Sequence, residues 1–255
     1  ASDVYKRQGQ TEAAGAFVST SQVNCTAPPS RSGVVPVEVS VNGVSFSDSG
    51  VTYTYQDTVS VLTVIPRSGP TAGGTNVSVI GAHLRPNATC RFGDDTAAAA
   101  VWLSSHELTC ISPSHISGSF ALEVTNNVQD WTSSYVQFSF VVPPRVDSVT
   151  PVLGPEHGGT LVEIEGGPFD SDSEELACKF GGGRLVKAWR SSNTKLRCRT
   201  PPATPGHNAT VHVSTNGQQV SLGTDVVFEF QRAMQLTSIE PSMGPAGGGT
   251  PVSYT

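Results

Sequence analysis

The chain has 255 residues, a formal net charge of −6 and 14% charged residues, against roughly 25% in an average soluble domain. Its 26 Gly and 18 Pro make it rich in turns, but not rich enough for a collagen-like or disordered chain. The length favours two or three small domains, the negative charge argues against a nucleic-acid partner, and no apolar run is long enough for a transmembrane helix.

Three landmarks recur in the same order along the chain. The segment 66–75, Pro-Arg-Ser-Gly-Pro-Thr-Ala-Gly-Gly-Thr, returns in similar form at 151–160 and at 241–250. Cys90-Arg91-Phe92-Gly93 returns in similar form at 178–181. The segment 108–113, in which a proline stands three residues after Cys110, returns at 196–201 and 23–28. Three landmarks at one period predict a tandem array.

The first unit is incomplete. A gap-free alignment of Cys25 with Cys110 predicts that residues 9–59 are the C-terminal part of a domain. The match fails before residue 9, where Tyr5 stands opposite Cys90, so residues 1–8 are predicted to be a non-native or scar segment.

Two complete domains follow, at residues 60–142 and 143–232, and residues 233–255 begin a further one. After each Gly-Gly-Thr the apolar positions alternate, as at Val77 and Val79 or Val162 and Ile164, which predicts a half-buried strand. Later strands end at Asn42-Gly43, Asn126-Asn127 and Asn216-Gly217, which favour hairpin turns. About seven short strands per unit predict an all-β chain of tandem immunoglobulin-like sandwiches.

These motifs together resemble the IPT/TIG domain, the immunoglobulin-like module of plexins and Met-type receptors, over nearly the whole chain from residue 9. Short junctions, one of them stiffened by Pro143-Pro144, predict an extended, semi-rigid rod. Either the chain is a window on a longer array, which we favour, or its two ends complete each other between neighbouring chains by strand donation.

Two pairs of cysteines have the same spacing. Cys90 and Cys110 lie 20 residues apart, as do Cys178 and Cys198, which predicts one disulfide bond per complete domain. Zinc is the weaker alternative, because neither unit has a Cys-x-x-Cys pair or a matching pair of histidines. Cys25 corresponds to the second cysteine of a unit whose first is missing.

Four Asn-x-Ser/Thr sequons predict N-glycosylation, at Asn24, Asn76, Asn87 and Asn208. Asn76 is expected to point outward from its strand and Asn208 to lie in a loop, while Asn24 is the weakest candidate. Disulfides, sequons and low charge agree on an extracellular or cell-surface chain. No cofactor other than covalent N-glycans is expected.

No catalytic motif is present, so no enzymatic activity and no catalytic or metal-binding residue is predicted. The glycine-rich motif is followed by a strand, whereas a phosphate loop needs a helix N-terminus. The acidic run 170–175 is a minor calcium candidate that lacks the loop glycine, and it is expected to be a solvated loop. The six histidines are expected in solvated loops; they are His83, His106, His115, His157, His207 and His212.

Aromatic residues precede the second cysteine of each unit. Trp102 and Trp189, eight and nine residues before it, are expected with Phe17 to occupy matching places and to pack against the disulfide rather than form a sugar-stacking platform. Trp131 has no such counterpart and is a candidate for exposure.

Two functions compete most closely. The favoured hypothesis is a structural glycoprotein that self-associates into a rod, fibril or coat. The alternative is the ectodomain of a plexin-like receptor or adhesion protein that binds a protein or glycan ligand. An accessory module of a carbohydrate-active enzyme would need a catalytic domain elsewhere. The DNA-binding members of the family are disfavoured by the charge and the paired cysteines.

Overall fold

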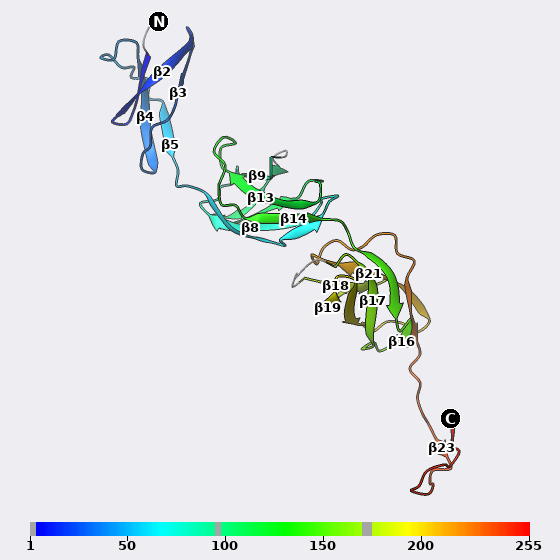
Figure 1. Cartoon of the computed structure of the whole chain (residues 1–255). Coiled ribbons are helices and arrows are strands. Elements are labelled where there is room, and N and C mark those ends of the chain that lie inside the picture. Colours follow the sequence, from blue (N-terminus) through cyan, green and yellow to red (C-terminus); the bar gives the residue numbers. More distant parts are fainter. Residues whose placement is uncertain (1–3, 95–97, 170–174) are drawn as a thin grey trace. The chain divides into compact units, whose positions relative to one another are not determined.

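The structure is a computed structural model that describes residues 4–94, 98–169 and 175–255. Across these ranges it consists of β-strands, turns and loops, without a helix (Figure 1). The predicted all-β class is therefore confirmed. The chain divides into two compact units, residues 1–59 and 60–255, which are described separately.

The first unit is one five-stranded sheet with the order β3-β2-β1-β4-β5. Val4 is its one buried apolar side chain among the described residues, because no second sheet of this unit packs on the first within those residues. The strands are β1 (Val4–Gln8), β2 (Thr11–Ser19), β3 (Gln22–Cys25), β4 (Gly33–Ser40) and β5 (Thr52–Tyr55).

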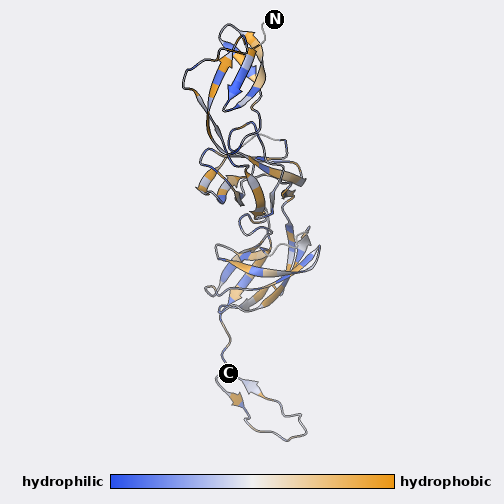
Figure 2. Cartoon of the chain, turned by 90° about the vertical axis from the view of Figure 1, so that its left-hand side faces the viewer, coloured by the Kyte–Doolittle hydropathy of each residue, from blue (hydrophilic) through white to orange (hydrophobic). Residues whose placement is uncertain are grey.

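The first complete domain opens the second unit and consists of two sheets, with the orders β10-β9-β13-β14-β7 and β11-β12-β8-β6. Hydrophobic and hydrophilic stretches are interspersed along the strands of the chain (Figure 2). Burial alternates along β8 and β12, whose inward residues, Val77, Val79, Leu108 and Cys110, face the core. The strands are β6 (Ser60–Ile65), β7 (Ser68–Pro70), β8 (Asn76–Ala82), β9 (Thr89–Phe92), β10 (Ala98–Ala99), β11 (Val101–Ser104), β12 (Glu107–Ile111), β13 (Gly118–Thr125) and β14 (Gln137–Val141).

An aromatic cluster fills the core of this domain. Phe92, Phe138 and Phe140 are fully buried and meet edge to face, with ring centroids 5.0–5.8 Å apart. This geometry places the positive edge of one ring on the negative face of the next. The predicted inward residues Val77 and Val79 are also fully buried.

The second complete domain repeats the two layers, but strand β19 runs through both and joins them into one eight-stranded sheet, β15-β17-β20-β19-β18-β21-β22-β16. Phe180, Phe228 and Phe230 repeat the aromatic cluster. The strands are β15 (Arg145–Thr150), β16 (Leu153–Pro155), β17 (Leu161–Gly167), β18 (Ala177–Phe180), β19 (Leu185–Ser192), β20 (Lys195–Arg199), β21 (His207–Ser214) and β22 (Val227–Gln231).

The glycine-rich motif is a structural turn in each domain. Gly73 and Gly74 have φ angles of +77° and +81°, and Gly158 and Gly159 repeat them at +73° and +84°. A side chain at Gly73 would collide with the backbone of Pro113. Glycine is required there because it alone adopts this backbone easily and leaves room for the neighbouring chain.

The last residues repeat only the start of a domain. Strands β23 (Ile239–Glu240) and β24 (Ser253–Tyr254) pair with each other, and Gly248 and Gly249 have φ angles of +80° and +88°. The motif therefore keeps its turn conformation in its third copy.

Candidate functional site

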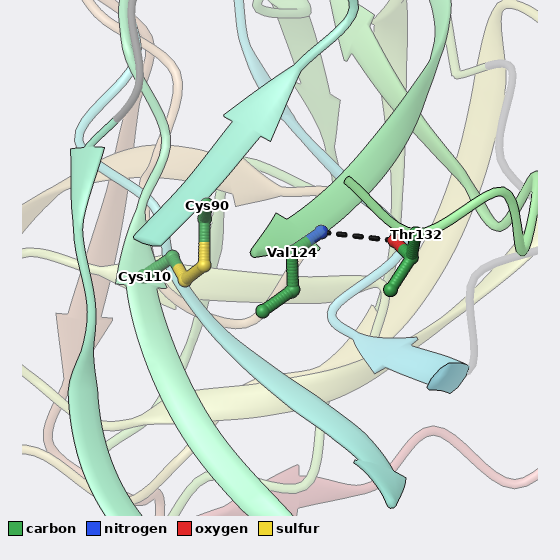
Figure 3. The surroundings of a disulfide bond; sticks show 4 residues. All are labelled: Cys90, Cys110, Val124 and Thr132. Atoms are coloured by element: carbon green, nitrogen blue, oxygen red, sulfur yellow. Dashed lines mark hydrogen bonds between the residues drawn. A yellow bond between two sulfur atoms is a disulfide. The ribbon is translucent and has the colours of Figure 1, made fainter. Parts of the chain in front are cut away.

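Both predicted disulfide bonds are present. Cys90 on β9 is joined to Cys110 on β12, and Cys178 on β18 to Cys198 on β20, with Cα atoms 6.4 and 6.5 Å apart. Figure 3 shows the first bond beside Val124 in the core. Each bond links the two layers of its sandwich.

Cys25 is a free thiol, and the strand register explains why. Lys6 lies opposite Val39, as Cys90 lies opposite Val124 in the next domain, so Lys6 stands where the first cysteine is expected. The gap-free alignment that placed Tyr5 there is wrong by one residue.

Residues 4–8 form β1 inside the sheet, between β2 and β4. Lys6 is nevertheless buried, and the buried side-chain amide of Gln8, at the position of Phe92, has no hydrogen-bond partner among the described residues. A buried amide without a partner is costly, which fits a segment foreign to this domain. The foreign origin of residues 1–8 stays a prediction.

A loop built on one asparagine recurs in every domain. The side-chain oxygens of Asn42, Asn127 and Asn216 each accept hydrogen bonds from the backbone N–H groups two and three residues further on. Asparagine favours such turns because its amide imitates a backbone carbonyl. We call these three turns the Asn loops.

A hydroxyl closes each Asn loop against its strand. Thr132 Oγ1 accepts a hydrogen bond of 3.0 Å from the backbone N–H of Val124 (Figure 3). Ser47 and Ser221 accept the corresponding bonds from Val39 and Val213. The loop is therefore held in the same way in all three domains.

The Asn loop of the second complete domain binds the glycine-rich turn of the first. Gln218 Oε1 accepts from the backbone N–H of Asn76 at 2.9 Å, and Gln218 Nε2 donates to the carbonyl of Asn76 at 2.8 Å. Gln219 Nε2 donates to the carbonyl of Gly74, and Thr75 Oγ1 donates to Gln219 Oε1, both at 3.0 Å. The amide of Gln218 thus pairs with the backbone as a neighbouring strand would, and the amide of Gln219 bonds one backbone carbonyl and one side-chain hydroxyl.

Asn216 completes this junction from a buried position. Its Nδ2 donates to Gln219 Oε1 at 2.6 Å and to the carbonyl of Ser68 at 3.3 Å. A cavity of about 360 Å³ opens beside these bonds. Its apolar wall is formed by Pro70, Ala72, Val141, Pro143, Pro144, Val220 and Leu222.

Trp131 is not exposed but half-buried under a cation. The guanidinium carbon of Arg91 lies 4.4 Å from the centre of its ring. Arg7 lies over Phe46 in the same way, at 4.3 Å. The second complete domain has Val220 at this position, next to the junction, and therefore lacks the arrangement.

The expectation that Trp102 and Trp189 occupy matching places against the disulfides is wrong. Trp102 lies opposite the buried Leu108, whereas Trp189 lies opposite Arg197 on the outer face. Their side chains are 40% and 51% exposed. The indole N–H of Trp102 donates to the carbonyl of Leu84 at 3.0 Å, which holds this ring at the edge of the sandwich.

All four predicted glycan acceptors are exposed. Asn208 lies on β21 rather than in a loop. Asn87 Nδ2 donates to the carbonyl of Asn126 at 2.7 Å. The amides of Asn24, Asn76 and Asn208 make no hydrogen bond within the described ranges. These three nitrogens are therefore accessible for modification.

A cross-strand ion network covers the outer face of the second complete domain. Glu163 accepts from Lys195 at 3.0 Å and from Arg197 at 2.8 Å. Hydrogen bonds from Arg197 and then Lys195 hold the pKa of Glu163 below its ordinary value. Glu165 raises the pKa of Lys195 in turn, and Glu163 adds to this effect.

The prediction of solvated loops is wrong for three histidines, since His207 and His212 lie on β21 and His115 is partly buried. The ring of His115 stacks on Phe140, with centroids 4.7 Å apart, and His212 Nδ1 lies 2.9 Å from the carbonyl of Ser221. Within the part of the chain that the structure describes, no three His, Cys, Asp or Glu side chains gather as metal ligands. The acidic run at 170–174 lies outside the described residues.

Disulfide-linked sandwiches with repeated Asn loops and glycine turns define a chain of tandem immunoglobulin-like modules. The family model described as "IPT/TIG domain" matches residues 3–55, 60–140 and 144–230. The chain belongs to the IPT/TIG domain family. The first match begins at residue 3, within residues 1–8, which the sequence predicted to be a non-native or scar segment.

Relatives carry such arrays within much longer proteins. The chain is 27% identical to Fibrocystin-L of Mus musculus over 245 residues, which cover 94% of the chain and 6% of that protein. It is 26% identical to Plexin-A2 of Homo sapiens over 208 residues, which cover 76% of the chain and 11% of that protein. The chain thus spans only a small part of these relatives.

A solved structure of the full extracellular region of plexin A4 shares the fold. The TM-score is 0.54 at 16% identity, covering 99% of this chain and 28% of the plexin chain. Family, disulfides and fold together place the chain outside the cell or at its surface. No helix of the described residues is long and apolar enough to cross a membrane.

Proposed function

We propose that this chain is part of the ectodomain of a plexin-like receptor or adhesion protein, and that it binds a protein or glycan ligand without catalysis. The observation that carries the proposal is the match to Plexin-A2 over 208 residues, which spans several tandem domains rather than one. A ligand that contacts more than one domain requires those domains to follow one another in a defined order, and a match of this length keeps that order.

The junction between the two complete domains gives this proposal a physical basis. The hydrogen bonds of Gln218 and Gln219 hold the two domains against each other at their glycine turn and Asn loop. A fixed junction lowers the entropy that a ligand must remove when it contacts both domains. Its apolar cavity, lined by Pro143 and Leu222 among others, is the kind of surface on which ligands bind.

A fibril or coat has less support than a receptor. The repetition that favoured it is shared by the plexin and fibrocystin-L relatives, so repetition does not distinguish the two roles. N-glycosylation at Asn24, Asn76, Asn87 and Asn208 agrees with either role.

The test is a binding screen with the full chain from a secreting, glycosylating host. Biotinylated chain, assembled on streptavidin, is applied to a panel of secreted proteins and cell-surface ectodomains and to a glycan array. We expect saturable binding to a defined ligand, and loss of that binding after reduction and denaturation.

Light scattering and negative-stain electron microscopy of the same material supply the opposing outcome. A monomer that binds one ligand supports the receptor. Ordered fibres with an axial repeat, together with no saturable binding in the screen, would refute it in favour of a structural protein.

A further inference from the structure

The outer face of sheet β11-β12-β8-β6 is unusually apolar. Residue pairing places Ile65, Ser78, Thr109 and Val101 in one row across this face. The side chains of Ile65 and Val101 are 48% and 63% exposed. Ile80 and Ile111 lie on the same face, and Leu62 and Leu103 extend from the bulges of its edge strands; both leucines and Ile111 are more than half exposed.

Charges on this face are few. Glu107 is occupied by a hydrogen bond of 2.7 Å from Ser78 Oγ, and Arg67 reaches Thr63 at 3.4 Å from beyond the end of β6. Contiguous exposed apolar area on a soluble domain is a liability for aggregation or a site that something covers. Strand β11 pairs on one side only among the described residues, and such an edge strand adds to this liability.

The second complete domain provides an internal comparison. The positions of Ser78, Ile80, Glu107 and Thr109 are held there by Glu163, Glu165, Lys195 and Arg197, which form the ion network described above. The same face of the same fold is thus charged in one domain and apolar in the other.

The two faces also differ in one glycan acceptor. Asn76 lies opposite Ile111, in the row next to Ser78, and its exposed side chain shares the apolar face. The corresponding residue of the second domain is Leu161, opposite Arg199, and it is not part of a sequon. The glycan acceptor is therefore present in the first complete domain, where this face is apolar, and absent from the second, where the face is charged.

We propose that an N-linked glycan on Asn76 lies over the outer face of β11-β12-β8-β6 and shields its apolar side chains from water and from other proteins. The first sugars are attached at a corner of the face and extend across Ile111 and Val101, whose methyl groups contact the C–H faces of the sugar rings. The hydroxyl groups of the glycan face the solvent and make the surface hydrophilic.

The glycan is compatible with the domain junction. Gln218 binds the backbone N–H and carbonyl of Asn76, and the Asn76 side chain remains exposed beside it. Attachment therefore requires no opening of the junction. The proposal depends on the extracellular location and not on the ligand-binding role, so its failure would leave that role untouched.

The first experiment uses the folded, glycosylated full chain. Mass spectrometry of its glycopeptides measures occupancy of Asn76. Hydroxyl-radical footprinting then compares labelling of Val101, Leu103 and Ile111 before and after enzymatic removal of N-glycans under native conditions. We expect occupied Asn76 and a severalfold rise in labelling of these residues on deglycosylation.

Variants separate the Asn76 glycan from the others. Asn76→Gln is expected to increase the fluorescence of anilinonaphthalene sulfonate severalfold and to cause self-association, whereas Asn208→Gln removes a glycan and leaves both unchanged. Ser78→Thr keeps the sequon and is the matched control. Adding Ile80→Lys, which lies opposite Glu107, and Ile111→Lys to Asn76→Gln should return the dye signal to its original level.

Enzymatic deglycosylation of the folded chain covers the case in which Asn76→Gln fails to fold. The proposal is overturned if Asn76 carries no glycan in the secreted chain. It is also overturned if labelling of Val101, Leu103 and Ile111 is the same with and without the glycan.

Discussion

The side-chain amide of Gln218 makes two hydrogen bonds with the backbone of Asn76, one in each direction, across 142 residues of sequence. This pairing joins two domains through atoms that every residue possesses. The pairing therefore requires a side-chain amide at position 218, whereas almost any side chain at position 76 would be compatible with it.

Removal of that amide should loosen the junction and leave the domains folded. Gln218→Ala removes the acceptor for the Asn76 N–H, and a neutral hydrogen bond contributes about 0.5–1.5 kcal/mol. We expect faster hydrogen exchange at the Asn76 amide, measured by NMR or mass spectrometry. The Leu161 amide has no such partner within the described residues, so its exchange should stay constant; an unchanged Asn76 rate would contradict the junction.

Lys6→Cys should create a third disulfide bond with Cys25. Lys6 occupies the position of Cys90 in the sheet, and Cys25 the position of Cys110. A new bond closing a loop of this size should stabilise the unit by about 3 kcal/mol in the chain-entropy model. Thiol titration should find no free thiol in the variant and one in the parent chain.

Gln8→Cys is the matched control for that bond, because it also places a cysteine on the buried side of β1. It should leave two free thiols. Two free thiols in Lys6→Cys as well would show that β1 does not hold the register described here.

The two glycines of the turn should respond differently to alanine. Both have positive φ, which costs about 1 kcal/mol or more for alanine. A side chain at Gly73 also meets the backbone of Pro113, whereas nothing lies within 4 Å of one at Gly74. Gly73→Ala should therefore destabilise its domain more than Gly74→Ala.

Chemical denaturation followed by tryptophan fluorescence measures this difference. A Trp189→Phe background leaves Trp102 and Trp131 as reporters of the domain in question. Equal losses for the two alanine variants would mean that the turn can move away from Pro113.

The ion network of the second complete domain should give a defined pH dependence. The pKa of Glu163 is lowered, so its contribution to stability is present above its ordinary value of 4.5 and lost as pH falls through the lowered one. The pKa of Lys195 is raised, so its contribution is present below 10.5 and lost as pH rises through the raised value. The contribution of this ion network to stability should be constant between these limits.

Lys195→Met should raise the pKa of Glu163, as measured by NMR titration of its carboxyl carbon. Lys187→Met removes the same charge from β19 without touching this network and should leave that pKa unchanged. An unchanged pKa of Glu163 in Lys195→Met would show that Arg197 alone lowers it.

The sequence predicted the sandwiches because their core follows simple alternation. Val162 and Ile164 point inward two residues apart, and the cysteines recur at one spacing, so periodicity and repetition carried the information. Asn42, Asn127 and Asn216 were also visible as turn residues. What the pattern did not show is that one of these turns binds another domain.

The aromatic residues show where counting along the chain fails. Trp102 and Trp189 differ by a single residue in their distance from the cysteine, and a shift of one reverses the face of a strand. Bulges after Trp102 and Arg190 alter the register locally. The bonds of Gln218 and Gln219 to the first complete domain could not be predicted for a different reason. Most of their partners are backbone atoms, which are the same in every residue, so no sequence pattern indicates them.

The glycine turn and the Asn loop recur in both complete domains, and Gln129 of the first domain stands at the position of Gln218. The position of Gln219, however, is held in the first domain by Asp130, whose carboxyl group accepts a hydrogen bond from Asn127. An aspartate has no amide to donate to a backbone carbonyl, as Gln219 does to Gly74. A single residue therefore distinguishes the Asn loop that docks on a glycine turn from its otherwise similar copy one domain earlier.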